Sequence, residues 1–175
     1  MHLKLKRTPG LYLAGFMGSG KTTIAKILSD QVGWDYVDVD AEIEKAEGMT
    51  IAQIFDTRGE PAFRRIETET IKTLVRKIEC GMPMVVALGG GAFVQPGNFE
   101  FMENNGLSVW LDCPFEVILQ RLGDTDDRPL ARDLGKLQAL YESRREGYSR
   151  ADFHIDAACD PETSVAKILE LNIWR

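Results

Sequence analysis

The sequence has little cysteine, no long apolar run and no excess of basic residues. Its three cysteines, Cys80, Cys113 and Cys159, form no C-x-x-C pair. Isolated thiols in odd number are typical of a reducing cytoplasm rather than of a secreted disulfide framework. No stretch approaches the roughly 20 apolar residues of a membrane span, and the charged start lacks the apolar core of a secretory signal. The net charge of −6 argues against general nucleic-acid binding, which needs a basic surface. We therefore expect a cytoplasmic protein that binds neither membranes nor nucleic acid.

What remains is an ordinary globular composition with a regular alternation of patterns. With 44% apolar and 27% charged residues, the chain suits a single domain over residues 1–175. Apolar runs of strand length alternate with segments of helical spacing, which predicts one α/β domain with a parallel sheet. The five predicted strands lie near residues 10–14, 35–39, 84–88, 107–111 and 152–155.

Residues 15–22, Gly-Phe-Met-Gly-Ser-Gly-Lys-Thr, match the pattern G-x-x-x-x-G-K-S/T of a phosphate-binding loop. The match stands between a predicted buried strand and a predicted helix, which is the context that this motif requires. Backbone N–H groups of such a loop and the positive end of the helix dipole hold phosphates. We expect Lys21 to reach the β- and γ-phosphates of a nucleoside triphosphate and the Thr22 hydroxyl to bind Mg²⁺. The expected nucleotide-binding residues are Gly18, Ser19, Gly20, Lys21, Thr22 and Thr23.

Two acids end the second predicted strand, whose pattern continues to residue 40. Ligands of open parallel sheets collect at the carboxyl ends of strands, and residues two apart on a strand face the same side. Asp38 is the candidate for holding Mg²⁺ through a water, because this ion keeps several waters. Asp40 could accept a hydrogen bond from an attacking hydroxyl, or it could be the N-cap of a helix over residues 41–47. The spacing leaves both roles of Asp40 open.

A long amphipathic helix is predicted over residues 61–79, and Arg64 and Glu67 lie three residues apart on it. A carboxylate beside a guanidinium could orient it to grip a substrate anion. An exposed ion pair worth a few tenths of a kcal/mol is the more ordinary interpretation, and the spacing favours it.

Three consecutive glycines, Gly89, Gly90 and Gly91, directly follow the central strand predicted at residues 84–88. Glycines at the end of a core strand let backbone N–H groups approach a ligand closely. We expect a ligand-binding wall here rather than a plain flexible turn.

Residues 123–134 form the most polar and least periodic segment, long enough to be a functional loop. Arg128 within it could swing over bound phosphates as part of a lid that excludes water. Arg121, one turn before this segment, could stack its planar group on a purine.

These motifs, in this order, resemble the shikimate kinase family over nearly the whole chain. The resemblance rests on the phosphate loop, D-x-D at residues 38–40, F-R-x-x-E at 63–67, the triple glycine and R-P-L at 128–130. It implies the nucleoside monophosphate kinase-like P-loop fold, a three-layer sandwich with a five-stranded parallel sheet. A mobile lid at about residues 123–134 and a substrate-binding helical region at about residues 41–79 would complete the domain. The implied activity is transfer of the ATP γ-phosphoryl group to the 3-hydroxyl of shikimate, with Mg²⁺, by a cytoplasmic monomer in chorismate and aromatic amino acid biosynthesis.

By the same resemblance, Asp40 activates the hydroxyl, and Arg64, steadied by Glu67, holds the substrate carboxylate. The family often has R-x-P-L-Y after the lid, and counting back from Tyr148 selects Arg144 as the second carboxylate ligand, with Arg145 as the alternative. The implied catalytic residues are Lys21, Asp40 and Arg128; the substrate-binding residues are Asp40, Arg64, Gly89, Gly90, Gly91 and Arg144; Arg121 and Arg128 join the nucleotide site, and Thr22 and Asp38 the metal site.

Two other functions remain compatible with the motifs. The same scaffold could phosphorylate another small hydroxy acid such as gluconate, or a nucleoside monophosphate. A catalytically silent nucleotide-binding module is the alternative outside enzymes. The paired arginines and the glycine wall suit a compact carboxylate better than a nucleotide base.

Overall fold

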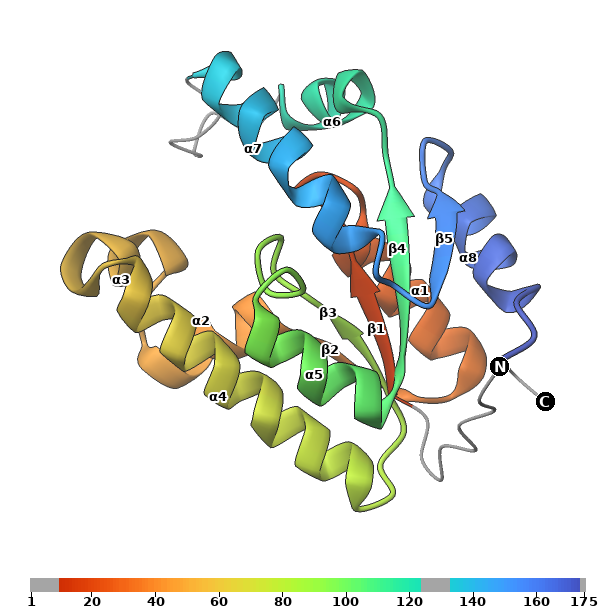
Figure 1. Ribbon diagram of the computed structural model, residues 1–175. Helices are drawn as coiled ribbons and strands as arrows, with labels where there is room; N and C mark the ends of the chain where they lie inside the picture. The colour runs from red at the N-terminus through yellow and green to blue at the C-terminus, as the bar shows by residue number, and fades with distance from the viewer. Residues whose placement is uncertain (1–9, 124–132, 174–175) are drawn as a thin grey trace.

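The computed structural model describes residues 10–123 and 133–173, in which helices cover both faces of a parallel sheet (Figure 1). Its strands are β1 (Gly10–Ala14), β2 (Asp35–Asp38), β3 (Met84–Ala87), β4 (Leu107–Asp112) and β5 (Phe153–Asp156). Its helices are α1 (Lys21–Val32), α2 (Val39–Glu47), α3 (Ile51–Arg58), α4 (Glu60–Glu79), α5 (Pro96–Asn105), α6 (Phe115–Leu122), α7 (Leu134–Tyr148) and α8 (Pro161–Leu169). The predicted α/β class and its five strands are confirmed, and each strand end lies within one residue of its predicted position.

The sheet places β1 at its centre, in the order β2–β3–β1–β4–β5 with parallel pairing throughout. Side chains of β1 alternate between two apolar clusters. Leu11 and Leu13 belong to the cluster that includes α1 and α8, whereas Tyr12 and Ala14 belong to the cluster with α4, α5 and α7. The connection after β1 runs through α1 on one face of the sheet, and the connection after its neighbour β3 runs through α5 on the other face. The carboxyl ends of β1 and β3 are therefore the switch point where α/β proteins bind ligands.

The second strand ends earlier than its pattern predicted. β2 stops at Asp38 and α2 begins at Val39, so the prediction that Asp40 lies on a strand two residues from Asp38 is wrong. The N-cap is Asp38, whose Oδ1 accepts from the Ala41 N–H at 3.2 Å. The alternative role of Asp40 as the N-cap is therefore wrong as well. Because Asp38 is both the last residue of β2 and the N-cap of α2, strand and helix join without a loop, and Asp40 lies in the first turn of α2.

The helix predicted over residues 61–79 is α4, one residue longer at its start, with a proline in its first turn. Its buried residues are Phe63, Glu67, Ile71, Leu74, Val75 and Ile78. A carboxylate among five apolar side chains needs a specific partner, because burial of an unpaired charge is costly. Nowhere in the described chain is a helix both long and apolar enough to cross a bilayer.

Candidate active site

The loop between β1 and α1 has the backbone that its glycines predicted. Gly15, Gly18 and Gly20 have φ values of 146°, 77° and 95°, a region that residues with a Cβ rarely adopt. Gly20 is the N-cap of α1, which has no side-chain cap and no acid in its first turn. The first N–H groups of the helix thus have no side-chain acceptor, and the site fits a phosphate group.

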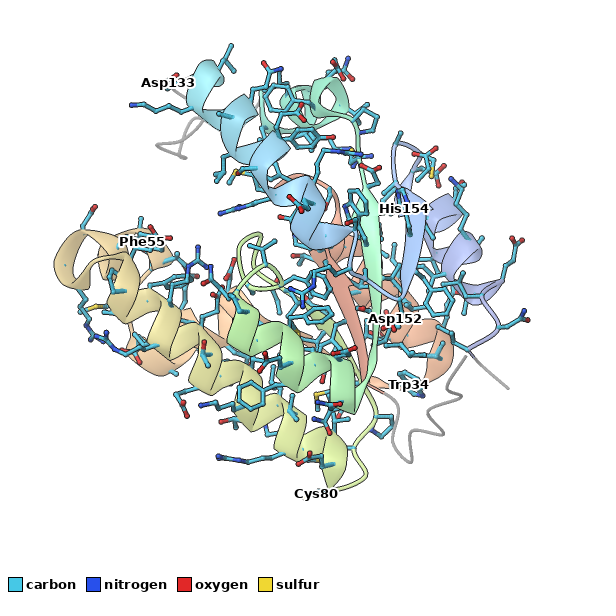
Figure 2. All side chains as sticks on the ribbon, in the orientation of Figure 1. Trp34, Phe55, Cys80, Asp133, Asp152 and His154 are labelled. Carbon is cyan, nitrogen blue, oxygen red and sulfur yellow. The ribbon has the colours of Figure 1, made fainter. Side chains whose placement is uncertain are left out.

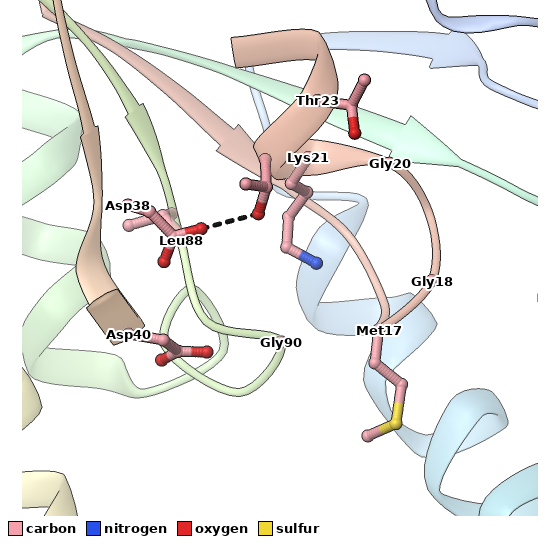
Figure 3. Close-up of a pocket in the computed structure, with 10 residues that line it drawn as sticks. Met17, Gly18, Gly20, Lys21, Thr23, Asp38, Asp40, Leu88 and Gly90 are labelled. Carbon is pink, nitrogen blue, oxygen red and sulfur yellow. Dashed lines mark hydrogen bonds between the residues drawn. The ribbon is translucent and has the colours of Figure 1, made fainter. Parts of the chain in front are cut away.

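Lys21 folds back over this loop. Its Nζ donates to the carbonyl oxygens of Gly15 and Phe16, each at 2.8 Å. The ammonium group is thereby held above the loop, at the mouth of a pocket of about 210 Å³ (Figure 3). Lining residues are Met17, Gly18, Gly20, Lys21, Thr22, Thr23, Asp38, Asp40, Leu88 and Gly90.

The two residues expected at the metal site lie in contact. The Thr22 hydroxyl donates to Asp38 Oδ2 at 2.6 Å, across the gap between α1 and the end of β2 (Figure 3). No group of three or more His, Cys, Asp or Glu side chains suited to a metal occurs among the described residues. One hydroxyl and one carboxylate beside a phosphate loop fit Mg²⁺, which takes few protein ligands and completes its shell with phosphates and water.

Asp40 comes to the same pocket from α2, although the strand argument for it was wrong. A Cβ atom at Gly89 would lie only 2.8 Å from Asp40 Oδ1 and 3.1 Å from Glu67 Oε1. The two carboxylates therefore meet at the first glycine of the triplet. The absence of a side chain at Gly89 leaves room for both of them.

Arg64 and Glu67 form an ion pair at 2.8 Å, and the Glu67 side chain is 1% exposed. The interpretation that the spacing favoured, an exposed helical pair, is wrong because this face of α4 packs against the triple-glycine turn. Arg64 also contacts Glu60, one turn earlier, at 3.2 Å. Burial raises the pKa of Glu67, and the Arg64 guanidinium opposes this rise.

The triple glycine closes around Arg64. A Cβ atom at Gly91 would lie 2.5 Å from Nη2 and 2.8 Å from Nη1 of Arg64. The guanidinium is thus pressed against bare backbone on one side and tied to Glu67 and Glu60 on the other. Its orientation is determined before any ligand binds, which reduces the ordering cost of gripping an anion.

Arg144 and Arg145 are neighbours in sequence but point to different places. A Cβ atom at Gly90 would lie 3.2 Å from Arg144 Nη1, and the Arg144 guanidinium lies 5.6 Å from the centroid of the Phe16 ring. Arg145 instead binds both carboxylate oxygens of Asp112, at 2.7 and 3.0 Å. The glycine wall therefore has Arg144 beside it, and Arg145 has a partner at the end of β4.

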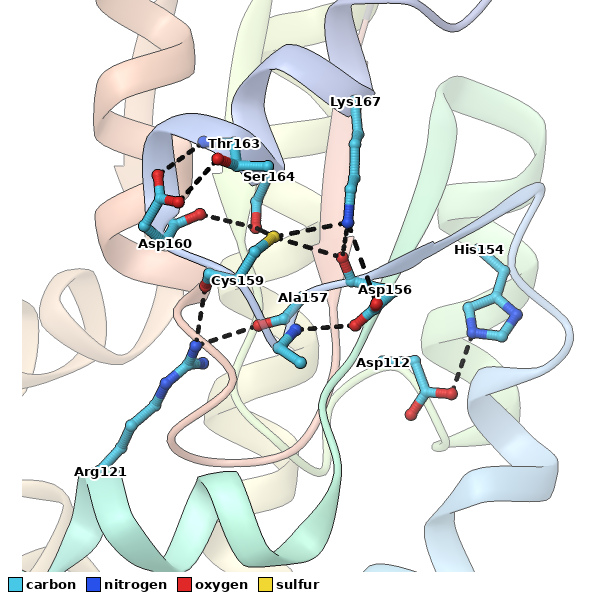
Figure 4. Close-up of polar contacts among 11 residues, drawn as sticks. Asp112, Arg121, His154, Asp156, Ala157, Cys159, Asp160, Thr163, Ser164 and Lys167 are labelled. Carbon is cyan, nitrogen blue, oxygen red and sulfur yellow. Dashed lines mark hydrogen bonds and ion pairs between the residues drawn. The ribbon is translucent and has the colours of Figure 1, made fainter.

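Arg121 lies beside the phosphate loop and the segment that follows β5. Its guanidinium donates to the carbonyl oxygens of Gly18 at 3.3 Å, Ala157 at 3.1 Å and Cys159 at 3.0 Å, the last two shown in Figure 4. It also lines a second hollow, of about 490 Å³, together with Ser19, Gly20 and Thr23. Arg128 lies outside the described residues.

Sequence reasoning missed three contributions to this site: the second contact of Arg64 with Glu60, the Tyr148 hydroxyl that donates to the Gly90 carbonyl, and the Asp112–Arg145 pair. The first could have been found, because Glu60 precedes Arg64 by one helical turn. The other two join residues 58 and 33 positions apart, and no local pattern signals them.

The family model described as Shikimate kinase matches residues 17–172. The chain belongs to the shikimate kinase family. This membership confirms the nucleoside monophosphate kinase-like P-loop fold that the motifs implied.

Individual relatives agree with the family model. The chain is 42% identical over 166 residues to the shikimate kinase of Synechococcus elongatus, which covers 92% of this chain and 85% of that protein. It is similar to a crystal structure of shikimate kinase from Aquifex aeolicus, with 39% identity, a TM-score of 0.79 and coverage of 91% and 93%. It is also similar to shikimate kinase from Acinetobacter baumannii in complex with shikimate, with 35% identity, a TM-score of 0.87 and coverage of 97% of both chains.

Proposed function

We propose that this protein transfers the γ-phosphoryl group of ATP to the 3-hydroxyl of shikimate, producing shikimate 3-phosphate and ADP for aromatic amino acid biosynthesis. One observation carries the assignment. Arg64, Arg144 and Asp40 all lie within contact distance of the triple-glycine wall, next to the phosphate loop. Guanidinium groups fit a carboxylate, and an acid fits a hydroxyl about to lose its proton. The pocket therefore suits a small acid that carries hydroxyl groups.

On the substrate side, Arg64 and Arg144 would hold the carboxylate from two directions, one from α4 and one from α7. Arg144 rather than Arg145 takes this role, because Arg145 already shares two hydrogen bonds with Asp112. Glu67 would keep the Arg64 guanidinium oriented, and the backbone of Gly89, Gly90 and Gly91 would close the site around the ring.

On the phosphoryl side, the work is positioning and charge stabilisation, since the transition state of phosphoryl transfer is loose. The Lys21 ammonium and the backbone N–H groups of residues 18–23 would bind the phosphate oxygens. Asp40 would accept the hydroxyl proton late in the transfer, so it needs only ordinary basicity. We retain Arg128 as the lid residue that adds positive charge.

Two accessory sites complete the proposal. Mg²⁺ bound between the phosphates, Thr22 and Asp38 would neutralise part of the phosphate charge. Arg121 would lie against the adenine in the second hollow, beside Ser19 and Thr23. The protein would act as a cytoplasmic monomer without nucleic-acid partners; its net charge of −6 disfavours a nucleic-acid-binding surface.

The test is ADP release by the purified chain with shikimate, gluconate and a nucleoside monophosphate as alternative acceptors. Activity with shikimate and none with the others is expected. Asp40→Asn should lower kcat by about 10²–10⁴-fold, the range of a general base, and Lys21→Met should lower it by about 10²–10³-fold as a lost charge stabiliser.

The matched controls are Glu42→Gln on the exposed face of α2 and Lys26→Met on the exposed face of α1, both with kcat near wild type. ATP binding without transfer to any of the acceptors would favour the silent module. Preferential turnover of gluconate or a nucleotide would replace shikimate by that substrate. Full activity of either active-site variant would remove its assigned role.

A further inference from the structure

The Asp112–Arg145 ion pair lies outside the pocket that the proposed reaction uses. Asp112 is the last residue of β4, and Arg145 lies in the last turn of α7. Two nitrogens of the guanidinium donate to the two carboxylate oxygens, at 2.7 and 3.0 Å. The side chains are 19% and 35% exposed for Asp112 and Arg145, respectively. This bidentate geometry restricts the relative orientation of the guanidinium and the carboxylate as well as their distance, which a single ammonium contact does not.

Neighbouring groups hold this pair in place. Arg145 Nη1 also donates to the Tyr141 hydroxyl at 2.7 Å, and that hydroxyl donates to the Cys113 carbonyl at 3.0 Å. His154 Nε2 lies 3.0 Å from Asp112 Oδ2 (Figure 4). Burial would raise the pKa of Asp112, but hydrogen bonds from Arg145 and His154 outweigh it and hold that pKa below its ordinary value. The carboxylate is therefore ionised at neutral pH and available to Arg145.

Arg145 also lies on an aromatic surface. Its guanidinium carbon is 5.0 Å from the centroid of the Trp110 ring, and His154 stacks on Trp110 at 4.4 Å with an interplanar angle of 16°. Figure 2 shows His154 on β5, beside β4. The end of α7 is thus held on β4 by Asp112 and Trp110, and His154 of the neighbouring strand β5 contacts both of these residues.

The same turn of α7 carries Arg144 to the glycine wall. The Tyr148 hydroxyl donates to the Gly90 carbonyl, and a Cβ atom at Gly147 would lie 2.5 Å from Val94 Cγ1. Consecutive helical residues are about 100° apart around the axis, so the direction of Arg145 determines that of Arg144. At the ~5–6 Å radius of helical side chains, a rotation of only 10° would move the Arg144 guanidinium by about 1 Å.

We propose that Arg145 is a positioning residue for substrate binding: by pairing with Asp112 it sets the rotation of α7, which aims Arg144 at the substrate carboxylate beside Gly90. The inference rests on the proposed function and adds a residue that touches neither substrate. A misplacement of about 1 Å by a remote change can cost as much as 10²-fold in rate. An effect mainly on shikimate is expected, because most of the proposed nucleotide contacts lie on the phosphate loop and α1, and Arg121 lies on α6, rather than on α7.

The experiment compares Arg145→Met, Asp112→Asn and the double variant with Arg144→Met and the wild type. Each single change at the pair should raise the KM for shikimate about 10-fold, whereas kcat and the KM for ATP change less than threefold. The KM of the double variant for shikimate should match that of each single variant within about twofold, because the two single changes remove the same interaction. Arg145→Lys should rescue only in part, since an ammonium cannot bind both oxygens in a fixed plane.

The matched control is Lys136→Met, which breaks the exposed Lys136–Asp133 pair at 3.4 Å on the same helix and should leave all constants at wild-type values. An unchanged shikimate KM in Arg145→Met would overturn the inference. So would an equal rise of both KM values with a large fall in Tm, which marks a merely structural role.

Failure of the proposed function would appear separately, as a wild-type enzyme inactive on shikimate. The geometric claim would still be tested by a crystal structure of Arg145→Met. The Arg144 guanidinium should leave its place beside Gly90 there; an unmoved Arg144 would refute the inference whatever the substrate is.

Discussion

A methyl group at Gly91 should weaken the proposed binding of the substrate carboxylate by Arg64 without unfolding the protein. In Gly91→Ala the new Cβ would lie 2.5, 2.8 and 3.0 Å from Nη2, Nη1 and Cζ of Arg64. Gly91 is not among the glycines with positive φ, so alanine meets no backbone strain. The perturbation is therefore steric and is directed at a single guanidinium group.

The magnitude follows from these distances. Carbon–nitrogen contacts ordinarily lie near 3.5 Å, so the guanidinium must retreat by about 1 Å. The moving atoms are the end of a flexible side chain, and the loss in free energy of unfolding should stay near 1 kcal/mol, part of one charge-assisted hydrogen bond to Glu67. At ~2–4 °C per kcal/mol for a domain of this size, Tm should fall only slightly. A displaced carboxylate ligand should nevertheless raise the KM for shikimate by about 10–100-fold.

The assay is steady-state kinetics with each substrate varied in turn, which gives both KM values and kcat. Thermal unfolding gives Tm. The matched control is Gly97→Ala in α5, where a Cβ atom meets nothing within 4 Å and φ is not in the left-handed region. That variant should keep wild-type kinetics and gain up to about 1 kcal/mol from helix propensity. A wild-type shikimate KM in Gly91→Ala would refute the claim that Arg64 holds the substrate at this wall.

Two further predictions concern stability. The lowered pKa of Asp112 means that the folded state favours the ionised carboxylate, so its contribution is present above the ordinary value of 3.8 and is lost as the pH falls through the lower folded value. Urea unfolding should show Asp112→Asn to be less stable than wild type by about 1 kcal/mol at pH 7. If this difference in free energy of unfolding did not shrink below pH 3.8, the assigned pairing would be contradicted. Tyr148→Phe removes the donor to the Gly90 carbonyl and should cost about 1 kcal/mol of unfolding free energy, because a partly buried acceptor loses its partner. Tyr148 stays protonated throughout, since burial raises its pKa to about 12. An unchanged Tm in Tyr148→Phe would show that water replaces the lost donor.

The features predicted correctly from the sequence are those with local physical causes. The phosphate loop needs positive φ at particular glycines and a helix directly after it, and Gly15, Gly18 and Gly20 meet that need within six residues. The proximity of Arg64 and Glu67 follows from helical spacing alone. Strand positions followed from apolar runs, because a parallel sheet is buried on both faces.

The predictions that were wrong concern features that depend on contacts between segments far apart in the chain. Helical spacing predicts an exposed pair of Arg64 and Glu67, because it contains no information about what packs on the helix, whereas the Glu67 side chain is 1% exposed beside the glycine wall. The residue pattern predicts Asp40 on a strand, whereas the cap at Asp38 starts α2 two residues earlier than expected. The direction of Arg145 depends on Asp112, 33 residues before it, and no local pattern shows that Arg144 rather than Arg145 lies beside Gly90.

The sequence by itself determined the class of the domain, the phosphate loop and the family to which the chain belongs, because these depend on short patterns and on the order of motifs. Tertiary structure alone decided which oxygen and nitrogen atoms share the pocket, how deeply Glu67 is buried and which of two adjacent arginines faces the triple-glycine wall. The physical reason is that burial and direction arise from packing between segments far apart in the chain. A rotation of a few degrees in α7, which no local pattern records, changes the direction of Arg144.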